Sequence, residues 1–201
     1  MKSFIEVSGL SHSFGEKKVL DNISFQAAKG EITGLLGPSG AGKTTLVNLL
    51  TGQIKPGAGK ITIDGDTGNR SRAGIMMDSF GLYERLSVYE NLKIFAGIYR
   101  APRERIDGLL KKAEMIKEKK TTVGKLSKGM RSRVNFCRAL LKECDILYLD
   151  EPTSGLDPAT TKKIHEMMLE EKSAGTTIFL TTHNMHEAEK LCDRVLLLNE
   201  G

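Results

Sequence analysis

The sequence has no long hydrophobic run. No stretch of its 201 residues approaches the roughly 18 consecutive apolar residues that a helix needs to cross a bilayer. The first ten residues, MKSFIEVSGL, also lack the apolar core of a secretory signal peptide. We therefore expect neither a membrane span nor a secretion signal. We expect the chain to be cytoplasmic.

Cysteine and aromatic residues are scarce. The three cysteines, Cys137, Cys144 and Cys192, form no C-x-x-C pair, which favours small buried thiols over a disulfide framework or a metal site. Aromatic residues make up 5% of the chain and do not alternate with basic ones, so the composition does not favour a base-stacking groove. We expect no direct nucleic-acid partner.

Positive charge is concentrated in one segment. The chain has a net charge of +5, but between Arg100 and Arg133 twelve Lys and Arg residues meet four Asp and Glu residues, so this segment carries +8 and the rest −3. This favours either an anion-binding surface or a solvated helix face. Within it, LSKGMRSRVNFCRALL places Lys128 and Arg131 near a predicted helix N-terminus, where the helix dipole disfavours positive charge.

Strand-like and helix-like segments alternate along the chain. Strands are predicted at residues 4–10, 19–27, 31–37, 59–65, 73–78, 145–152, 176–183 and 194–200. Helices are predicted at residues 43–52, 87–120 with a break near Pro102, 126–141, 161–175 and 184–192. This order predicts an α/β fold with a mostly parallel sheet covered on both faces. A helical block interrupts the alternation, so we interpret residues 80–133 as an inserted subdomain and residues 1–79 and 134–201 as the core.

The stretch GPSGAGKTT at residues 37–45 matches the phosphate-binding pattern G-x-x-x-x-G-K-[ST], between a predicted strand and a predicted helix. Its glycines let successive backbone N–H groups face phosphate oxygens, and the helix adds the positive end of its dipole. Lys43 suits the β- and γ-phosphates, and the Thr44 hydroxyl suits Mg²⁺. The predicted nucleotide-binding residues are Gly37, Pro38, Ser39, Gly40, Ala41, Gly42, Lys43 and Thr44.

Two carboxylates follow a buried strand in ILYLDEP. Open α/β sheets bind ligands at the carboxyl ends of their strands, so Asp150 is predicted to bind Mg²⁺, and Glu151 to orient or deprotonate an attacking water. His183 ends the next predicted strand, at the same edge of a parallel sheet, and is predicted to contact phosphate. No comparable argument applies to the other histidines, His12, His165 and His186.

These motifs, together with SGLD at residues 154–157 and LSKGM at residues 126–130, resemble the nucleotide-binding domain of ABC transporters over essentially the whole chain. The resemblance implies a P-loop NTPase core with an N-terminal antiparallel β portion, ATP and Mg²⁺ as cofactors, and ATP hydrolysis. It also implies a transmembrane permease partner and a peripheral position on the inner face of the cell membrane. The segment YENLKIFAGIYR is more similar in sequence to drug or antibiotic exporters than to importers. The alternative is an ATPase of the same fold that acts on nucleic acid or ribosomes.

In this family two such domains bind head to tail around two ATP molecules, which implies a second copy or a close relative as partner. Ser127 and Gly129, in LSKGM, would then contact the γ-phosphate of the ATP held by the partner, and Asp157 would reach across the interface. A triphosphate at this helix N-terminus would balance the basic residues Arg131 and Arg133. The alternative is that their side chains point into solvent.

Four further positions follow from the resemblance. Phe14 would stack on adenine, or else be a buried core residue, and Thr45 would assist at the α-phosphate. Leu82 and Tyr83 would contact the permease, or else pack against the core.

Two departures from the family pattern affect chemistry. LSKGM differs from the commonest form, LSGGQ, at Lys128 and Met130, which leaves the strength of binding open. Asp78 occupies the position of a glutamine that usually touches Mg²⁺ and the attacking water, and no glutamine follows Gln53. An aspartate would ligate Mg²⁺ but repel the γ-phosphate, so we predict slower or more Mg²⁺-sensitive turnover.

Overall fold

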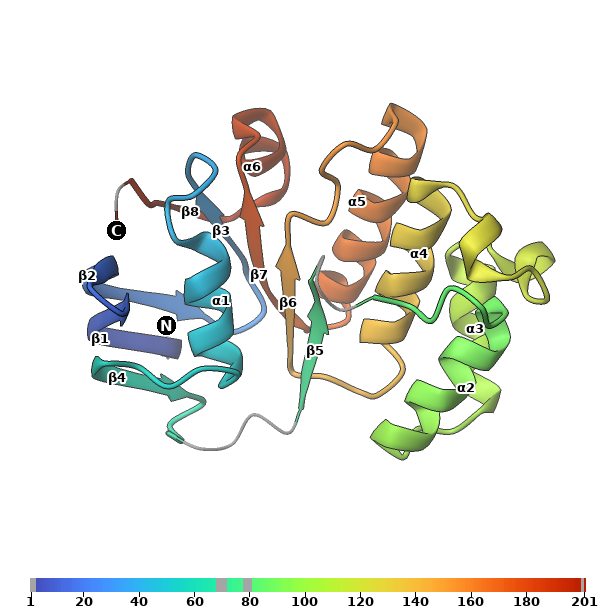
Figure 1. Ribbon diagram of the computed structural model, residues 1–201, viewed down its shortest axis with the longest axis horizontal. Coiled ribbons are helices and arrows are strands. Elements are labelled where there is room, and N and C mark those ends of the chain that lie inside the picture. The colour runs from blue at the N-terminus through green and yellow to red at the C-terminus, as the bar shows by residue number, and fades with distance from the viewer. Residues whose placement is uncertain (1–2, 68–71, 78–80, 200) are drawn as a thin grey trace.

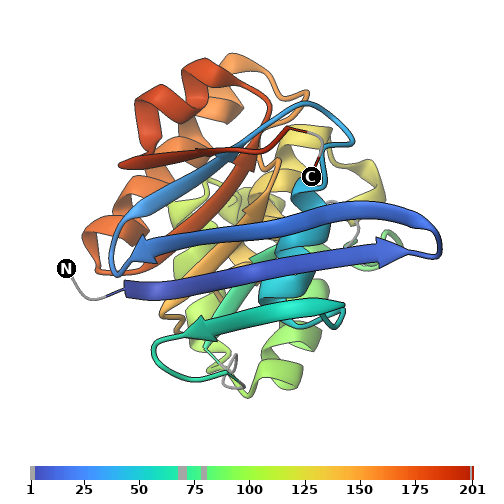
Figure 2. The ribbon, with the colours of Figure 1, turned by 90° about the vertical axis from the view of Figure 1, so that its left-hand side faces the viewer.

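A computed structural model of the chain describes residues 3–67, 72–77, 81–199 and 201. Within these residues the strands form two sheets, one antiparallel in the order β2-β1-β4 and one parallel in the order β5-β6-β7-β3-β8 (Figures 1 and 2). The antiparallel strands are β1 (Ser3–Phe14), β2 (Lys17–Ala28) and β4 (Ala58–Ile63). The parallel strands are β3 (Ile32–Leu36), β5 (Ala73–Met76), β6 (Ile146–Asp150), β7 (Thr177–Thr182) and β8 (Arg194–Leu197).

Helices cover both faces of the parallel sheet. They are α1 (Lys43–Thr51), α2 (Val88–Tyr99), α3 (Glu104–Lys112), α4 (Lys128–Ala139), α5 (Pro158–Ser173) and α6 (Met185–Leu191), with short 3₁₀ turns η1 (Ile116–Glu118) and η2 (Val123–Lys125). Figure 1 shows α1 between the two sheets, α5 and α4 on the opposite side, and α2 and α3 outermost. The predicted α/β fold with a mostly parallel sheet and an antiparallel N-terminal portion is therefore confirmed.

Local capping sets where the helices begin and end. Ser87 accepts a hydrogen bond from the N–H of Glu90, and the Glu90 carboxylate accepts one from the N–H of Ser87, so α2 begins with a capping box. Asp157 caps α5, with Pro158 at its first position. Gly52 ends α1 at φ 75°, a left-handed conformation that glycine adopts without steric cost.

The parallel sheet divides the core into two layers. Alternate side chains of β6 point to opposite faces, so Tyr148 packs in the cluster around α1, while Leu147 and Leu149 pack in the cluster with α4 and α5. A sheet covered on both faces needs apolar residues at every strand position, which explains why the apolar run ILYL in β6 is unbroken. The cluster with α4 and α5 also includes side chains of α2 and α3.

α4 runs without a break across residue 133, where we proposed a boundary between the helical subdomain and the core. In the part of the chain that the structure describes, no helix combines the length and the hydrophobicity that crossing a membrane requires. The three cysteines are free; Cys137 is buried, and Cys144 and Cys192 are half-buried.

Candidate functional site

The phosphate-binding loop connects β3 to α1. Gly40 and Gly42 have φ values of 86° and 102°, which residues other than glycine rarely adopt. A Cβ at Gly42 would also lie 3.1 Å from the carbonyl oxygen of Val19. Gly42 is the N-cap of α1 and contributes no side-chain acceptor, so the first-turn N–H groups of this helix are available to an anion.

Lys43 is buried at the floor of this loop, with 6% of its surface exposed. Its ammonium donates to the carbonyl oxygens of Gly37 at 2.7 Å and Pro38 at 3.0 Å, and it lies 3.2 Å from Oε1 of Glu151. A buried charge is costly unless it is paired and hydrogen-bonded, and these three oxygens offset that cost. The predicted phosphate ligand is therefore held inside the site by its own loop and by the predicted base.

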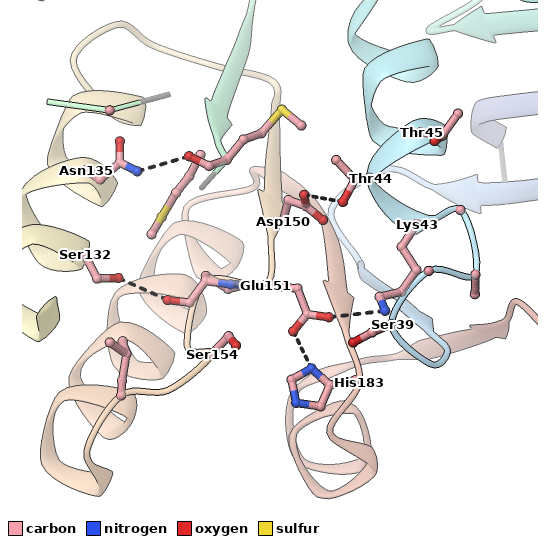
Figure 3. Close-up of a pocket in the computed structure, with 18 of the residues that line it drawn as sticks. Ser39, Lys43, Thr44, Thr45, Ser132, Asn135, Asp150, Glu151, Ser154 and His183 are labelled. Atoms are coloured by element: carbon pink, nitrogen blue, oxygen red, sulfur yellow. Dashed lines mark hydrogen bonds and ion pairs between the residues drawn. The ribbon is translucent and has the colours of Figure 1, made fainter. Parts of the chain in front are cut away.

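Asp150 ends β6 and accepts two hydrogen bonds from hydroxyl groups. Thr44 Oγ1 donates to one carboxylate oxygen at 2.8 Å (Figure 3). Thr181 Oγ1 donates to the other at 2.5 Å. Oxygen atoms of this kind are the ligands that Mg²⁺ prefers, so the donor set of Thr44 and Asp150 fits the predicted ion. The described residues hold no cluster of three or more His, Cys, Asp and Glu side chains suited to a metal, so phosphate and water oxygens would complete the coordination.

Glu151 carries the most unusual backbone conformation of the site. Its φ is 50°, a left-handed conformation that persists in a non-glycine residue only where the surroundings hold it. Its N–H donates to the carbonyl and the hydroxyl of Thr181, at 3.2 and 3.1 Å. Its carboxylate lies between Lys43 and His183, whose Nδ1 is 2.7 Å from Oε2 (Figure 3). Lysine, glutamate and histidine thus form one continuous chain of contacts.

These groups face one cavity of about 890 Å³, a size typical of small-molecule sites. Its lining includes Lys17, Lys18, Val19, Ser39, Gly40, Ala41, Gly42, Lys43, Thr44, Thr45, Lys128, Ser132, Asn135, Asp150, Glu151 and His183. Of the predicted nucleotide-binding residues, Gly37 and Pro38 reach the site through the carbonyl groups that hold Lys43. Phe14, Ser127, Gly129 and Asp157 are not among the lining residues.

Phe14 ends β1 with 55% of its surface exposed, which excludes the alternative of a buried core residue. Its ring packs edge-on against His12, with the ring centroids 4.8 Å apart. The cavity is lined instead by the start of the adjoining strand, at Lys17.

Ser127 and Asp157 are both helix N-caps. Ser127 Oγ accepts from the N–H of Met130 at 3.2 Å, and Asp157 accepts from the N–H of Thr160 at 2.9 Å. The hydrogen bonds from Thr160 hold the pKa of the Asp157 carboxyl below its usual value. The two helices touch at Gly129, where a Cβ would lie 2.7 Å from Thr160 Oγ1. Glycine is therefore needed here for packing within the chain.

The basic residues at the start of α4 have partners in their own chain. Arg131 donates to the carbonyl oxygens of Gly124 and Leu126, at 3.0 and 3.2 Å, and pairs with Glu84 at 2.9 Å. Arg133 donates to the carbonyl of Ala113 at 3.1 Å. These contacts exclude the alternative that both guanidinium groups point freely into solvent, while the docking of a triphosphate at this helix N-terminus stays a prediction. Lys128 and Arg131 both line the cavity.

Two predicted residues, Leu82 and Tyr83, lie at the entrance to the helical block. Leu82 lines the cavity and packs against the core, while Tyr83 is 53% exposed and stacks on Phe95 with centroids 6.0 Å apart. Asp78, predicted to ligate Mg²⁺, lies outside the described residues.

Sequence reasoning missed Thr181, which holds both Asp150 and the backbone of Glu151. The signal was present in the threonines of TTH, because the parallel register of β6 and β7 places Thr181 beside Asp150. That register could not be derived from the sequence.

Comparison with known proteins agrees with this geometry. The family model described as ABC transporter matches residues 20–154. Nod factor export ATP-binding protein I of Rhizobium sp. (strain N33) is 41% identical over 210 residues, covering 100% of this chain and 69% of that protein. A fluoroquinolones export ATP-binding protein of Mycobacterium tuberculosis is 38% identical over 205 residues, covering 98% of this chain and 68% of that protein.

A solved structure of a dimeric ATP-binding cassette in a post-hydrolysis state, bound to ADP and Pi, matches with a TM-score of 0.87. It is 27% identical and covers 98% of this chain and 95% of that one. The sequence match spans the phosphate-binding loop and the acidic strand end, and the structural match extends over both sheets and the helical block. The chain therefore belongs to the ABC transporter family, as one of its ATP-hydrolysing ATP-binding proteins.

Proposed function

We propose that this chain is the ATPase subunit of an exporter, in which two ATP-binding chains close around two Mg–ATP molecules and drive a separate transmembrane permease from the cytoplasmic side. The observation that carries this proposal is the convergence of Lys43, Asp150, Glu151 and His183 on one cavity beside the glycine-rich loop. Relatives named for the export of Nod factor and fluoroquinolones support the exporter assignment.

Each residue of the site has a distinct role in phosphoryl transfer to water. The first-turn amides of α1 and the Lys43 ammonium bind the β- and γ-phosphates, while Thr44 and Asp150 would hold Mg²⁺. Mg²⁺ bound there supplies positive charge to the phosphate oxygens. Glu151 accepts the proton of the attacking water, and His183 orients Glu151 and contacts the γ-phosphate.

The pairing of Lys43 with Glu151 links binding to catalysis. A triphosphate competes with the Glu151 carboxylate for the same ammonium, at present 3.2 Å away. When Lys43 turns to the phosphate, Glu151 keeps His183 as its partner and gains an oxygen able to accept a proton. The base thus becomes available when the substrate is bound.

The second ATP-binding chain supplies groups that this cavity lacks. Ser127 and Gly129 do not line the cavity of their own chain, and the N–H groups at the start of α4 suit a phosphate presented from outside. Asp157 lies on the helix that packs against Gly129, so it would share the same interface. The dimeric structural neighbour supports this arrangement.

The proposal is tested by the dependence of ATPase rate on protein concentration and by affinity capture from cells. A rate that rises more steeply than first order in protein, and capture of a polytopic membrane protein, would support it. Strictly first-order hydrolysis with no paired species under any nucleotide would contradict the dimer. Capture of nuclease-sensitive complexes instead would favour the nucleic-acid or ribosome alternative.

A further inference from the structure

We infer that Glu187 and His165 are positioning residues for hydrolysis: buried behind the cavity, they hold the loop that follows Glu151 against the strand end that precedes His183. The inference deepens the proposed function and rests on it, because the two groups that are positioned are the proposed base and its histidine partner.

Glu187 is buried on α6, with 3% of its surface exposed, and its carboxylate joins three segments that are distant in the sequence. Thr153 Oγ1, from the loop after Glu151, donates to Oε1 at 2.6 Å. His165 Nε2, from the middle of α5, lies 2.8 Å from the same oxygen. Thr182, the residue before His183, contributes a further side-chain hydrogen bond.

The Glu187 carboxylate is ionised at neutral pH. Burial raises its pKa, but hydrogen bonds from His165, Thr153 and Thr182 outweigh burial and leave the pKa below its ordinary value. The imidazole of His165 is correspondingly a donor through Nε2. Its Nδ1 is buried and has no hydrogen-bond partner among the described residues, so a proton on Nδ1 would leave a buried N–H group unsatisfied.

This network acts on the site through backbone geometry. Thr153, His165 and Glu187 are not among the residues that line the cavity, so they do not contact a nucleotide there. Glu151 has a φ of 50°, which the loop after it must help to hold, and Thr153 anchors that loop by its side chain.

The other side of the site is held in the same way. Thr182 accepts from the N–H of Asn184 at 3.0 Å, so the residues on both sides of His183 are tied to the carboxylate of Glu187. One buried carboxylate therefore sets the 2.7 Å approach of His183 to Glu151. In catalysis a misplacement of about 1 Å can cost a factor of roughly 100.

Paired substitutions separate hydrogen bonding from packing. His165→Gln keeps an N–H donor near the position of Nε2, whereas His165→Leu fills similar space without a donor; Thr153→Ser and Thr153→Val form a second pair. In the full-length chain with Mg–ATP, we expect the Leu and Val variants to lose about tenfold in kcat with KM for ATP within about twofold. The Gln and Ser variants should keep kcat within about twofold of the wild type.

Thermal melting of every variant identifies loss of fold, and ¹⁵N NMR of His165 in the wild type reports its tautomer without nucleotide. Wild-type kcat in folded His165→Leu, equal losses in His165→Gln and His165→Leu, or KM rising in step with the loss of kcat would each overturn the inference. A proton on Nδ1 alone would also overturn it. A wild-type chain without ATPase activity would instead contradict the proposed function, and the tautomer would still test the hydrogen bond to Glu187.

Discussion

The ammonium of Lys43 lies 3.2 Å from Oε1 of Glu151. The phosphate-binding cation and the proposed base therefore neutralise each other, and each controls the availability of the other. A change at Lys43 should therefore alter both nucleotide binding and hydrolysis. The other oxygen of Glu151 remains with His183 at 2.7 Å, so the carboxylate stays oriented whichever partner Lys43 takes.

Glu151→Gln should abolish hydrolysis while preserving ATP binding. Loss of a general base typically costs a factor of about 10² to 10⁴, and removal of the competing charge should leave ATP affinity unchanged or higher. The variant should also form an ATP-dependent dimer on gel filtration. Glu189→Gln, an exposed position on the same helix as Glu187, is the matched control. Turnover close to the wild type, or a monomer in saturating ATP, would argue against the assigned role.

Thr44→Val should raise the Mg²⁺ concentration needed for half-maximal ATPase activity. The Thr44 hydroxyl donates to Asp150 at 2.8 Å, so its removal deletes one proposed ligand and one of the two hydroxyl hydrogen bonds that hold the other. Loss of such support commonly weakens metal binding by about 10- to 100-fold. Titration of activity with Mg²⁺ measures the change, and Thr62→Val in β4 is the control. An unchanged Mg²⁺ midpoint would remove Thr44 from the metal site.

Gly129→Ala should destabilise the chain as well as weaken ATP-dependent pairing. The added Cβ would lie 2.7 Å from Thr160 Oγ1, and overpacking of this kind costs about 1–3 kcal/mol. Urea unfolding measures the first effect. Adding Thr160→Ala should recover much of the lost stability without restoring ATP-dependent pairing on gel filtration. Recovery of both properties together would show that Gly129 serves packing alone.

Asp78→Gln should increase turnover and relax its Mg²⁺ dependence. A neutral amide at this position would not repel the γ-phosphate and offers both a donor and an acceptor to water and metal. Steady-state ATPase assays over a range of Mg²⁺ concentrations test this expectation. An unchanged rate and unchanged Mg²⁺ dependence would count against the assignment of Asp78 to the glutamine position.

The stabilising effect of Glu187 should depend on pH. Because its folded-state pKa lies below the ordinary value of 4.5, the stabilisation is fully present above that value and is lost as the pH falls through the folded-state pKa. The difference in unfolding free energy between wild type and Glu187→Gln should therefore be largest near neutrality and shrink in acid. Urea unfolding at pH 7, 5 and 4 measures it; a difference that grows below pH 4.5 would contradict the ionised assignment.

The structure shows which features could be predicted from local sequence patterns. The strand β6, the loop of Gly40 and Gly42 and the N-cap of α4 at Ser127 were all predictable, because each depends on residues close in sequence. β1 instead runs to Phe14, beyond the predicted end at residue 10, because its pairing with β2 continues through several shifts of register. Such shifts depend on the partner strand and leave no signal in the segment itself.

The helix α4, which Ser127 caps, also combines a feature visible in the sequence with one that only packing decides. The sequence placed basic residues where the helix dipole disfavours them, and this conflict was visible without a structure. The way this conflict is resolved was not visible, since three of the acceptors of Arg131 and Arg133 are backbone carbonyl groups, and every residue type carries one. Only packing decides which carbonyl group lies within reach.

By itself the sequence determined the order of strands and helices, the chemistry of the phosphate loop and the pair of acidic residues at a strand end, because periodicity, glycine conformation and side-chain type act over a few residues. The tertiary structure decided the pairing of Lys43 with Glu151, the support of Asp150 by Thr181 and the burial of Glu187 against His165. These contacts join residues far apart in the chain, so their distances depend on strand register and on how the helices pack against the sheet.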